Sequence, residues 1–227
     1  SYAQSDFKRL IAYTSVSHMG FVLMGIYAGT SLALQGAVIQ MVCHAFSTGA
    51  LFIIAGSIQD RLQTRELDRM GGIWAVMPRM GSMMIFFALA SMGMPGIGNF
   101  IGEFLVLIGT YQVNAPAAVI ASFGLALSTV YSLYMIRRVL FGPPAALHPF
   151  FSDLPKTDLS RKEIAVISPL IVLLLWIGLH PQPLINTVAV ESGRKSISIK
   201  SIKKPEPLRI EKIFLDRQFG IKGDVQR

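Results

Sequence analysis

Charged residues and cysteines are scarce in this chain of 227 residues, and each scarcity excludes a class of protein. Charged side chains make up 15% of the sequence, whereas soluble domains usually carry about 25%. The single cysteine, Cys43, excludes both an intramolecular disulfide and a cysteine metal cluster. The sequence also lacks the spacings typical of metal, dinucleotide and nucleophile–base sites. It therefore predicts that this chain binds no cofactor and holds no redox centre.

Apolar residues dominate instead, at 52% of the sequence with a mean hydropathy of +0.52. A helix needs about 20 predominantly apolar residues to cross the hydrocarbon core of a bilayer. Four segments meet this requirement, residues 10–28, 36–58, 117–136 and 164–179. The composition therefore predicts an all-α polytopic membrane protein, surrounded by lipid and unsuited to binding nucleic acid.

A fifth apolar segment, residues 80–112, is interrupted in its middle. A continuous helix of that length would measure about 50 Å, well beyond a core about 30 Å thick. Pro95 removes a backbone donor and disfavours helix at Met94, and Gly96 and Gly98 loosen the chain further. We expect one span made of a discontinuous helix. Unwound backbone at membrane depth is tolerated beside a polar or wet interior.

Loop charge supports a count of five spans. In chain order the spans are residues 10–28, 36–58, 80–112, 117–136 and 164–179. Basic residues gather before the first of these, between the second and the third, and between the fourth and the fifth. The intervening links, residues 29–35 and 112–116, carry no charge. This alternation places the start of the chain on the inner side of the membrane.

The C-terminal part changes composition sharply. Residues 191–227 hold ten Lys and Arg and five Asp and Glu, a net charge of +5 out of the total of +8. We therefore predict a transmembrane domain over residues 1–186 and a basic extramembrane tail over residues 187–227. The span count places this tail outside, although its charge favours the inner side.

Glu103, His18 and His44 are the ionisable side chains within the spans. A charge at the bilayer centre costs about 2.5–3.5 kcal/mol on insertion scales, so such groups normally face a protein interior or water. Glu103 follows the Pro-Gly interruption, where a half-helix beginning near Asn99 would direct its positive end toward the break. Histidine can donate and accept protons near neutral pH. The three residues are candidates for proton transfer.

Structural alternatives stand beside this interpretation. Glu103 could form an ion pair or anchor a helix end, and each histidine could be a buried residue bonded to a neighbouring helix. Lys8 opens the first span and is a weaker candidate for proton transfer, since an anchor at the membrane interface explains it better. Gly20, Gly49 and Gly102 are expected to let helices approach closely near these residues.

Four motifs, in order, resemble the chain M family of respiratory complex I, called subunit 4 in mitochondria: KRLIAYTSVSHMGF, GAVIQMVCHAFSTGALF, MPGIGNFIGEFLVL and VYSLYMIRRVLFG. The likeness covers roughly residues 3–184 and is closer to the bacterial type. It implies an antiporter-like subunit with two inverted repeats, of which this chain holds most of the second. It also implies that His18 and His44 belong to a central hydrophilic axis, with Glu103 exchanging protons at its outer end or passing charge to an adjoining subunit.

The resemblance implies a proton-translocating subunit of NADH:quinone oxidoreductase, in the bacterial inner membrane rather than the mitochondrial one. Its partners would be other complex I membrane subunits, and NADH and quinone would be used elsewhere in the complex. Membrane subunits of Mrp-type cation/proton antiporters and of energy-conserving hydrogenases share these motifs. A structural fragment that only packs against partners is a further alternative.

Overall fold

The structure, a computed structural model, describes residues 4–142 and 157–188. The described residues are helical apart from their connections and contain no strand, only an isolated bridge between Asp6 and Glu66. The elements in chain order are α1 (Phe7–Ala28), α2 (Ser31–Leu62), the 3-10 helix η1 (Leu67–Arg69), α3 (Ile73–Val76), α4 (Pro78–Ser91), α5 (Gly98–Tyr111), α6 (Ala115–Leu140) and α7 (Arg161–Leu179). A further helical segment covers residues 182–188.

The all-α membrane class is confirmed. Among the described residues, α1, α2, α6 and α7 are long and apolar enough to cross a membrane, and they contain the four predicted segments. The helices extend beyond the predicted bounds, because a helix continues to its capping residue and not to the last apolar one. Thr30, for example, accepts a hydrogen bond from the backbone N–H of Ala33, so α2 begins before residue 36.

The predicted interruption of residues 80–112 is also confirmed. The segment forms two helices of 14 residues each, α4 and α5, separated by residues 92–97. Gly93 and Gly96 adopt φ values of +71° and +94°, which side chains with a Cβ rarely tolerate. Neither half spans a bilayer alone, so the count of five spans stays a prediction that treats α4 and α5 as one crossing.

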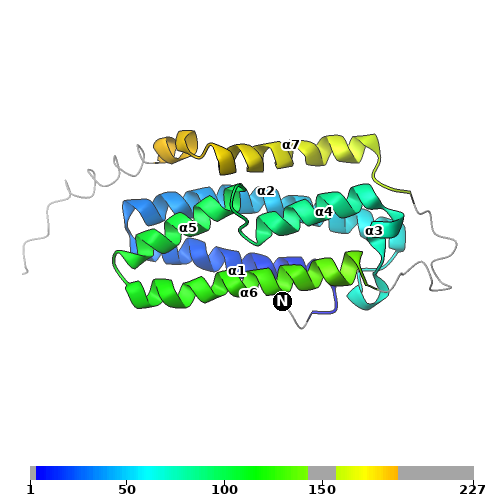
Figure 1. Cartoon of the computed structure of the whole chain (residues 1–227), viewed down its shortest axis with the longest axis horizontal. Coiled ribbons are helices and arrows are strands. Elements are labelled where there is room, and N and C mark those ends of the chain that lie inside the picture. Colours follow the sequence, from blue (N-terminus) through cyan, green and yellow to red (C-terminus); the bar gives the residue numbers. More distant parts are fainter. Residues whose placement is uncertain (1–3, 143–156, 189–227) are drawn as a thin grey trace, which may run out of the picture. The chain divides into compact units, whose positions relative to one another are not determined.

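The helices lie in three layers (Figure 1). The pair α4–α5 and the long helix α2 form the middle layer, with α7 on one face and α1 and α6 on the other. Helix α2 packs against both α4 and α5. Helix α7 packs against all three of these helices, α2, α4 and α5. This arrangement buries Ile97 of the junction between α4 and α5 and partly covers Gly93 and Gly96, whereas Met94 and Pro95 are exposed in this chain.

Glycines bring α2 and α5 into close contact. A Cβ on Gly102 would lie 2.7 Å from the backbone N and Cα of Gln40, and one on Gly36 would lie 2.6 Å from the backbone N of Val106. The expectation of close packing is therefore confirmed for Gly102. It is wrong for Gly20 and Gly49 among the described residues, where a Cβ would meet no atom within 4 Å. Gly20 instead lines an open groove between α1 and α6.

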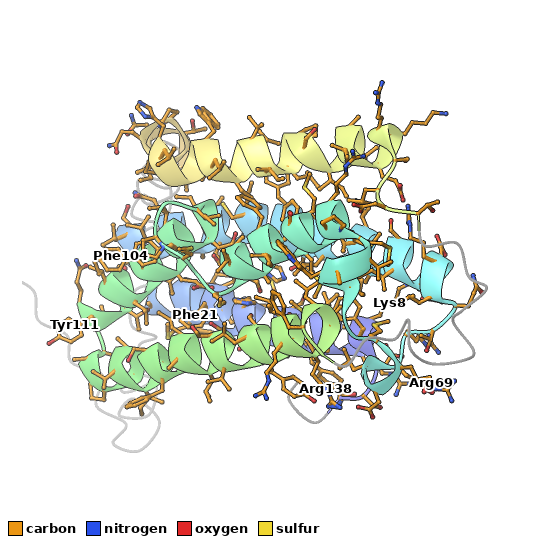
Figure 2. The ribbon with its side chains drawn as sticks, turned by 45° about the vertical axis from the view of Figure 1, so that its right-hand side comes forward. Lys8, Phe21, Arg69, Phe104, Tyr111 and Arg138 are labelled. Atoms are coloured by element: carbon orange, nitrogen blue, oxygen red, sulfur yellow. The ribbon has the colours of Figure 1, made fainter. Side chains whose placement is uncertain are left out.

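Basic residues gather at one end of the helices. Figure 2 shows Lys8, Arg69 and Arg138 toward one end and Tyr111 at the opposite end. This distribution agrees with the alternation of charge that defines the inner side. Of the predicted tail, residues 189–227 lie outside the described residues, so the domain boundary at 186–187 stays a prediction.

The outward faces of α6 and α7 are apolar. Ile120 and Phe123 on α6 are 72% and 66% exposed in this chain, and Val172 on α7 is 64% exposed. The buried set, in contrast, includes a glutamate, two histidines and several amides and hydroxyls. Apolar side chains outside and polar ones inside are the pattern expected of a protein surrounded by lipid and other membrane helices.

Candidate functional site

Glu103 and His18 form the centre of a buried polar cluster. Glu103 lies in the second turn of α5 and His18 in the middle of α1, and each side chain is at most 2% exposed. The distance between Glu103 Oε1 and His18 Nδ1 is 2.8 Å. The amide of Gln40 on α2 donates a second hydrogen bond, 2.9 Å long, to the same carboxylate oxygen. Three helices therefore converge on Glu103.

The second ring nitrogen of His18 contacts hydroxyl groups from two further elements. Tyr131 Oη on α6 lies 2.9 Å from His18 Nε2, and Ser91 Oγ at the end of α4 lies 3.3 Å away. When Nδ1 donates to the Glu103 carboxylate, Nε2 accepts from Tyr131. When Glu103 is protonated and donates to Nδ1, Nε2 carries the proton and donates to the Tyr131 oxygen. The imidazole of His18 can therefore connect Glu103 and Tyr131 by hydrogen bonds whether Nδ1 or Nε2 carries the proton.

His44 on α2 lies beside His18. The centroids of the two imidazole rings are 5.3 Å apart, and no direct hydrogen bond joins them within the described part of the chain. Thr48 Oγ1, one turn later on α2, is within 3.2–3.3 Å of both ring nitrogens of His44. The structure therefore brings together Glu103, His18 and His44, the three ionisable residues identified within the spans.

Polar side chains continue from this centre along the interface of α2 and α5. Asn99 on α5 donates to Ser47 Oγ on α2 over 3.0 Å. Three oxygens here, Glu103 Oε2, Gln40 Oε1 and Asn99 Oδ1, are buried and accept no hydrogen bond from other described residues. Buried acceptors are normally satisfied by a hydrogen bond. The interface consequently has the capacity to bind further donors, such as water.

The unwound residues 92–97 approach the carboxylate directly. Helical side chains lean toward the N-terminus, so Glu103 extends back toward the start of α5. A Cβ on Gly93 would lie only 2.7 Å from Glu103 Oε2. The break in the helix thus provides room for the acid, with a glycine where a larger residue would collide with it.

Lys8 lies outside this cluster. It is in the first turn of α1, ten residues before His18 and therefore about 15 Å away along the helix. Within residues 4–142 and 157–188, no group of three or more His, Cys, Asp and Glu side chains is arranged to hold a metal ion. The prediction that this chain binds no cofactor stays a prediction.

Several members of the cluster could not be assigned to it from the sequence. Gln40, Ser91, Asn99 and Tyr131 are uncharged at neutral pH, so their presence in an apolar helix does not by itself indicate a polar partner. Gln40 precedes His44 by one helical turn, and Asn99 precedes Glu103 by one turn. A search for hydrogen-bonding residues one turn from an intramembrane ionisable group would have found both of these.

Comparison with known proteins decides the family. The membrane family described as NADH:quinone oxidoreductase/Mrp antiporter matches residues 1–128, more than half of the chain. The chain belongs to this family. The matched residues include α1, α2 and both halves of the discontinuous helix, and hence the Glu103–His18–His44 cluster.

Individual members of the NADH:quinone oxidoreductase/Mrp antiporter family are closely similar to this chain. NADH-quinone oxidoreductase subunit M of Pseudomonas aeruginosa is 50% identical over 189 residues, which cover 83% of this chain and 36% of the relative. The subunit M of Escherichia coli strain K12 is 49% identical over 187 residues, covering 82% and 36%. The predicted resemblance to chain M is confirmed. The chain spans little more than a third of the length of these curated relatives.

A solved structure supports the same family. A chain of respiratory complex I from Thermus thermophilus with bound NADH superposes with a TM-score of 0.71 at 30% sequence identity. The match covers 83% of this chain and 40% of that one. Family membership and the apolar helices identify a membrane protein, and the bacterial relatives favour the bacterial inner membrane.

Proposed function

We propose that this chain is the proton-translocating part of an antiporter-like membrane subunit of respiratory complex I. Electron transfer from NADH to quinone takes place in other subunits, and neighbouring antiporter-like subunits are its partners. The similarity to subunit M from two bacteria supports this assignment. The chain contributes a buried route for protons and is part of an enzyme only as a component of the complex.

The observation that carries the proposal is the hydrogen-bonded series Glu103–His18–Tyr131, which crosses three helices within a buried interior. A proton that arrives on Glu103 passes to His18 Nδ1, while His18 Nε2 gives its proton to the Tyr131 oxygen. Tyr131 releases its own hydroxyl proton at the same time to a water molecule beyond it. The net result is the movement of one proton across the imidazole. Low polarity around the route confines the proton to these groups.

His44 extends the route along α2. The ring centroids of His18 and His44 are 5.3 Å apart, and no hydrogen bond joins the two rings among the described residues. Transfer to His44 therefore needs a rotation of one ring or a water molecule that contacts both. The buried acceptors Gln40 Oε1 and Asn99 Oδ1 are suited to orient such water molecules along the α2–α5 interface. Lys8 has no part in this scheme and acts as an anchor at the membrane interface.

Replacing Glu103 by Gln tests the proposal in membranes that contain the complete complex. The amide keeps the size of the side chain but cannot carry a proton at this position. We expect NADH-driven acidification of inverted membrane vesicles to be lost, with the amount of assembled complex and NADH:ferricyanide activity retained. Glu66→Gln is a matched control, because Glu66 lies outside the cluster and its side chain is 58% exposed. Full pumping by Glu103→Gln would refute the proposal.

The family description itself keeps an Mrp-type antiporter as a second candidate. An energy-conserving hydrogenase subunit is related by the same motifs. Neighbouring genes would separate these assignments, since quinone-reductase, antiporter or hydrogenase subunits would flank the coding sequence. A purely structural role predicts that Glu103→Gln and Glu66→Gln membranes pump equally.

A further inference from the structure

Helix α7 contacts α4, the first half of the discontinuous helix, near both ends of α4. It packs against α2, α4 and α5. Figure 1 shows α7 running alongside α4 and ending close to the junction of α4 and α5. The proton-transfer cluster contains no residue of α7, so the proposed route leaves this helix without a function.

At its beginning, α7 is attached to α2 by a bidentate ion pair between Arg61 and Glu163. Arg61 Nη2 lies 2.8 Å from Glu163 Oε2, and Arg61 Nη1 donates to Glu163 Oε1 over 3.0 Å. Arg61 Nε also donates to the backbone oxygen of Thr157 over 2.7 Å. Paired hydrogen bonds of this geometry fix the relative orientation of the two side chains. The first turn of α7 is therefore held against the end of α2.

The residues before α7 also cap α4. Asp158 Oδ2 accepts a hydrogen bond of 2.8 Å from the backbone N–H of Arg79, and Asp158 Oδ1 accepts one of 3.0 Å from that of Met80. These two N–H groups lie in the first turn of α4, where they have no partner within the helix. The start of α4 is thus anchored to the start of α7.

At its other end, α7 meets the unwound segment without intervening side chains. Any Cβ on Gly178 would collide with the backbone oxygen of Gly96. A Cβ on Gly98 would lie 3.2–3.3 Å from Ile177, which is 3% exposed. The last turn of α7 is therefore in backbone contact with the same short segment whose Gly93 adjoins Glu103 Oε2.

The geometry points to α7 as a strut that sets the position of the break in the α4–α5 helix, with Gly178 as a positioning residue for Glu103. The inference rests on the proposed proton-transfer role of Glu103. Asp158 holds the start of α4 and Gly178 holds the segment after its end. Helix α7 joins the two as one continuous helix that includes Pro169 in its interior. Any displacement of the break would move Gly93 relative to the Glu103 carboxylate and alter the distance to His18.

Gly178→Ala in the complete complex tests the inference. The added methyl group must push α7 and Gly96 apart, whereas in Gly49→Ala, the matched control on α2, the methyl group meets no atom within 4 Å. The readout is the number of protons pumped per NADH oxidised by assembled complex. A shift of about 1 Å can slow transfer about 100-fold, so we expect this ratio to fall at least about twofold for Gly178→Ala and to remain unchanged for Gly49→Ala. If Gly178 contributed only to stability, Gly178→Ala would lower the amount of assembled complex and leave the number of protons pumped per NADH unchanged.

Ile177→Leu provides a milder variant, because it keeps the volume of the side chain and removes Cγ2, the atom that lies 3.2 Å from the Cβ position of Gly98. We expect a smaller fall in the ratio than for Gly178→Ala, with Ile171→Leu on the same helix as the control. An unchanged ratio in assembled Gly178→Ala overturns the inference. Should Gly178→Ala fail to assemble, an unchanged ratio in Ile177→Leu overturns it and a reduced one supports it. Normal pumping by Glu103→Gln would instead refute the proposed function.

Discussion

Glu103 and His18 lie 85 positions apart in the sequence, yet Glu103 Oε1 and His18 Nδ1 are 2.8 Å apart in a fully buried interior. Insertion of either group into lipid alone would be unfavourable by a few kcal/mol. Their contact satisfies both groups and creates a pair across which a proton can move.

His18→Gln is expected to separate hydrogen bonding from proton relay. The amide can still donate to Glu103, but it cannot bind a proton on one side and release another on the opposite side. Loss of a positioned acid–base group slows proton transfer about 100-fold or more. Pumping in inverted vesicles should therefore cease while assembly is kept. His180→Gln is the control, because His180 follows α7 at an exposed position, and it should pump normally.

Tyr131→Phe is expected to weaken pumping without abolishing it, because Ser91 Oγ, 3.3 Å from His18 Nε2, remains as a second acceptor for the proton. The variant loses the 2.9 Å contact with His18 Nε2 and keeps the aromatic ring in place. A neutral hydrogen bond contributes about 1 kcal/mol, which corresponds to a decrease of roughly fivefold in rate. Initial rates of vesicle acidification measure the effect. Equal losses in Tyr27→Phe, whose ring is 87% exposed, would contradict a specific role of Tyr131.

Gly102→Ala is expected to destabilise the bundle. The added methyl group would lie 2.7 Å from the backbone of Gln40, so α2 and α5 must move apart. Overpacking of this kind costs about 1–3 kcal/mol. We expect a lower temperature of thermal inactivation and less assembled complex. Gly20→Ala, where the methyl group meets no atom within 4 Å, should match the parent protein on both measures.

Arg61→Ala and Glu163→Ala should each lower the temperature of thermal inactivation, and the double variant should lose less than the sum of the two single losses. The Arg61–Glu163 bonds are lost in both single variants, whereas each side chain also has a partner of its own, Thr157 for Arg61 and Ser160 for Glu163. The two side chains are 13% and 28% exposed and share paired hydrogen bonds, so their effects are coupled. We expect a coupling energy of about 1–2 kcal/mol. The exposed pair Arg69–Glu66 is the reference and should show about 0–1 kcal/mol. Fully additive losses for Arg61 and Glu163 would disprove the coupling.

Much of the architecture could be predicted from the sequence. The four long apolar helices are confirmed, as is the interruption of residues 80–112, because hydrophobic length and proline chemistry act locally. Glu103, His18 and His44 could be singled out for the same reason, since the cost of placing an ionisable group in lipid depends on its own segment. Their role in proton transfer stays a prediction.

Tertiary packing alone decided which groups meet. Tyr131, Gln40 and Ser91 reach the Glu103–His18 pair from three different helices, and no local rule specifies that convergence. The contact of Gly178 with Gly96 likewise depends on how α7 crosses the break. Hydropathy and helix propensity are properties of single segments, whereas distances between side chains follow from the rotation and spacing of neighbouring helices, which small residues such as Gly102 set by close packing.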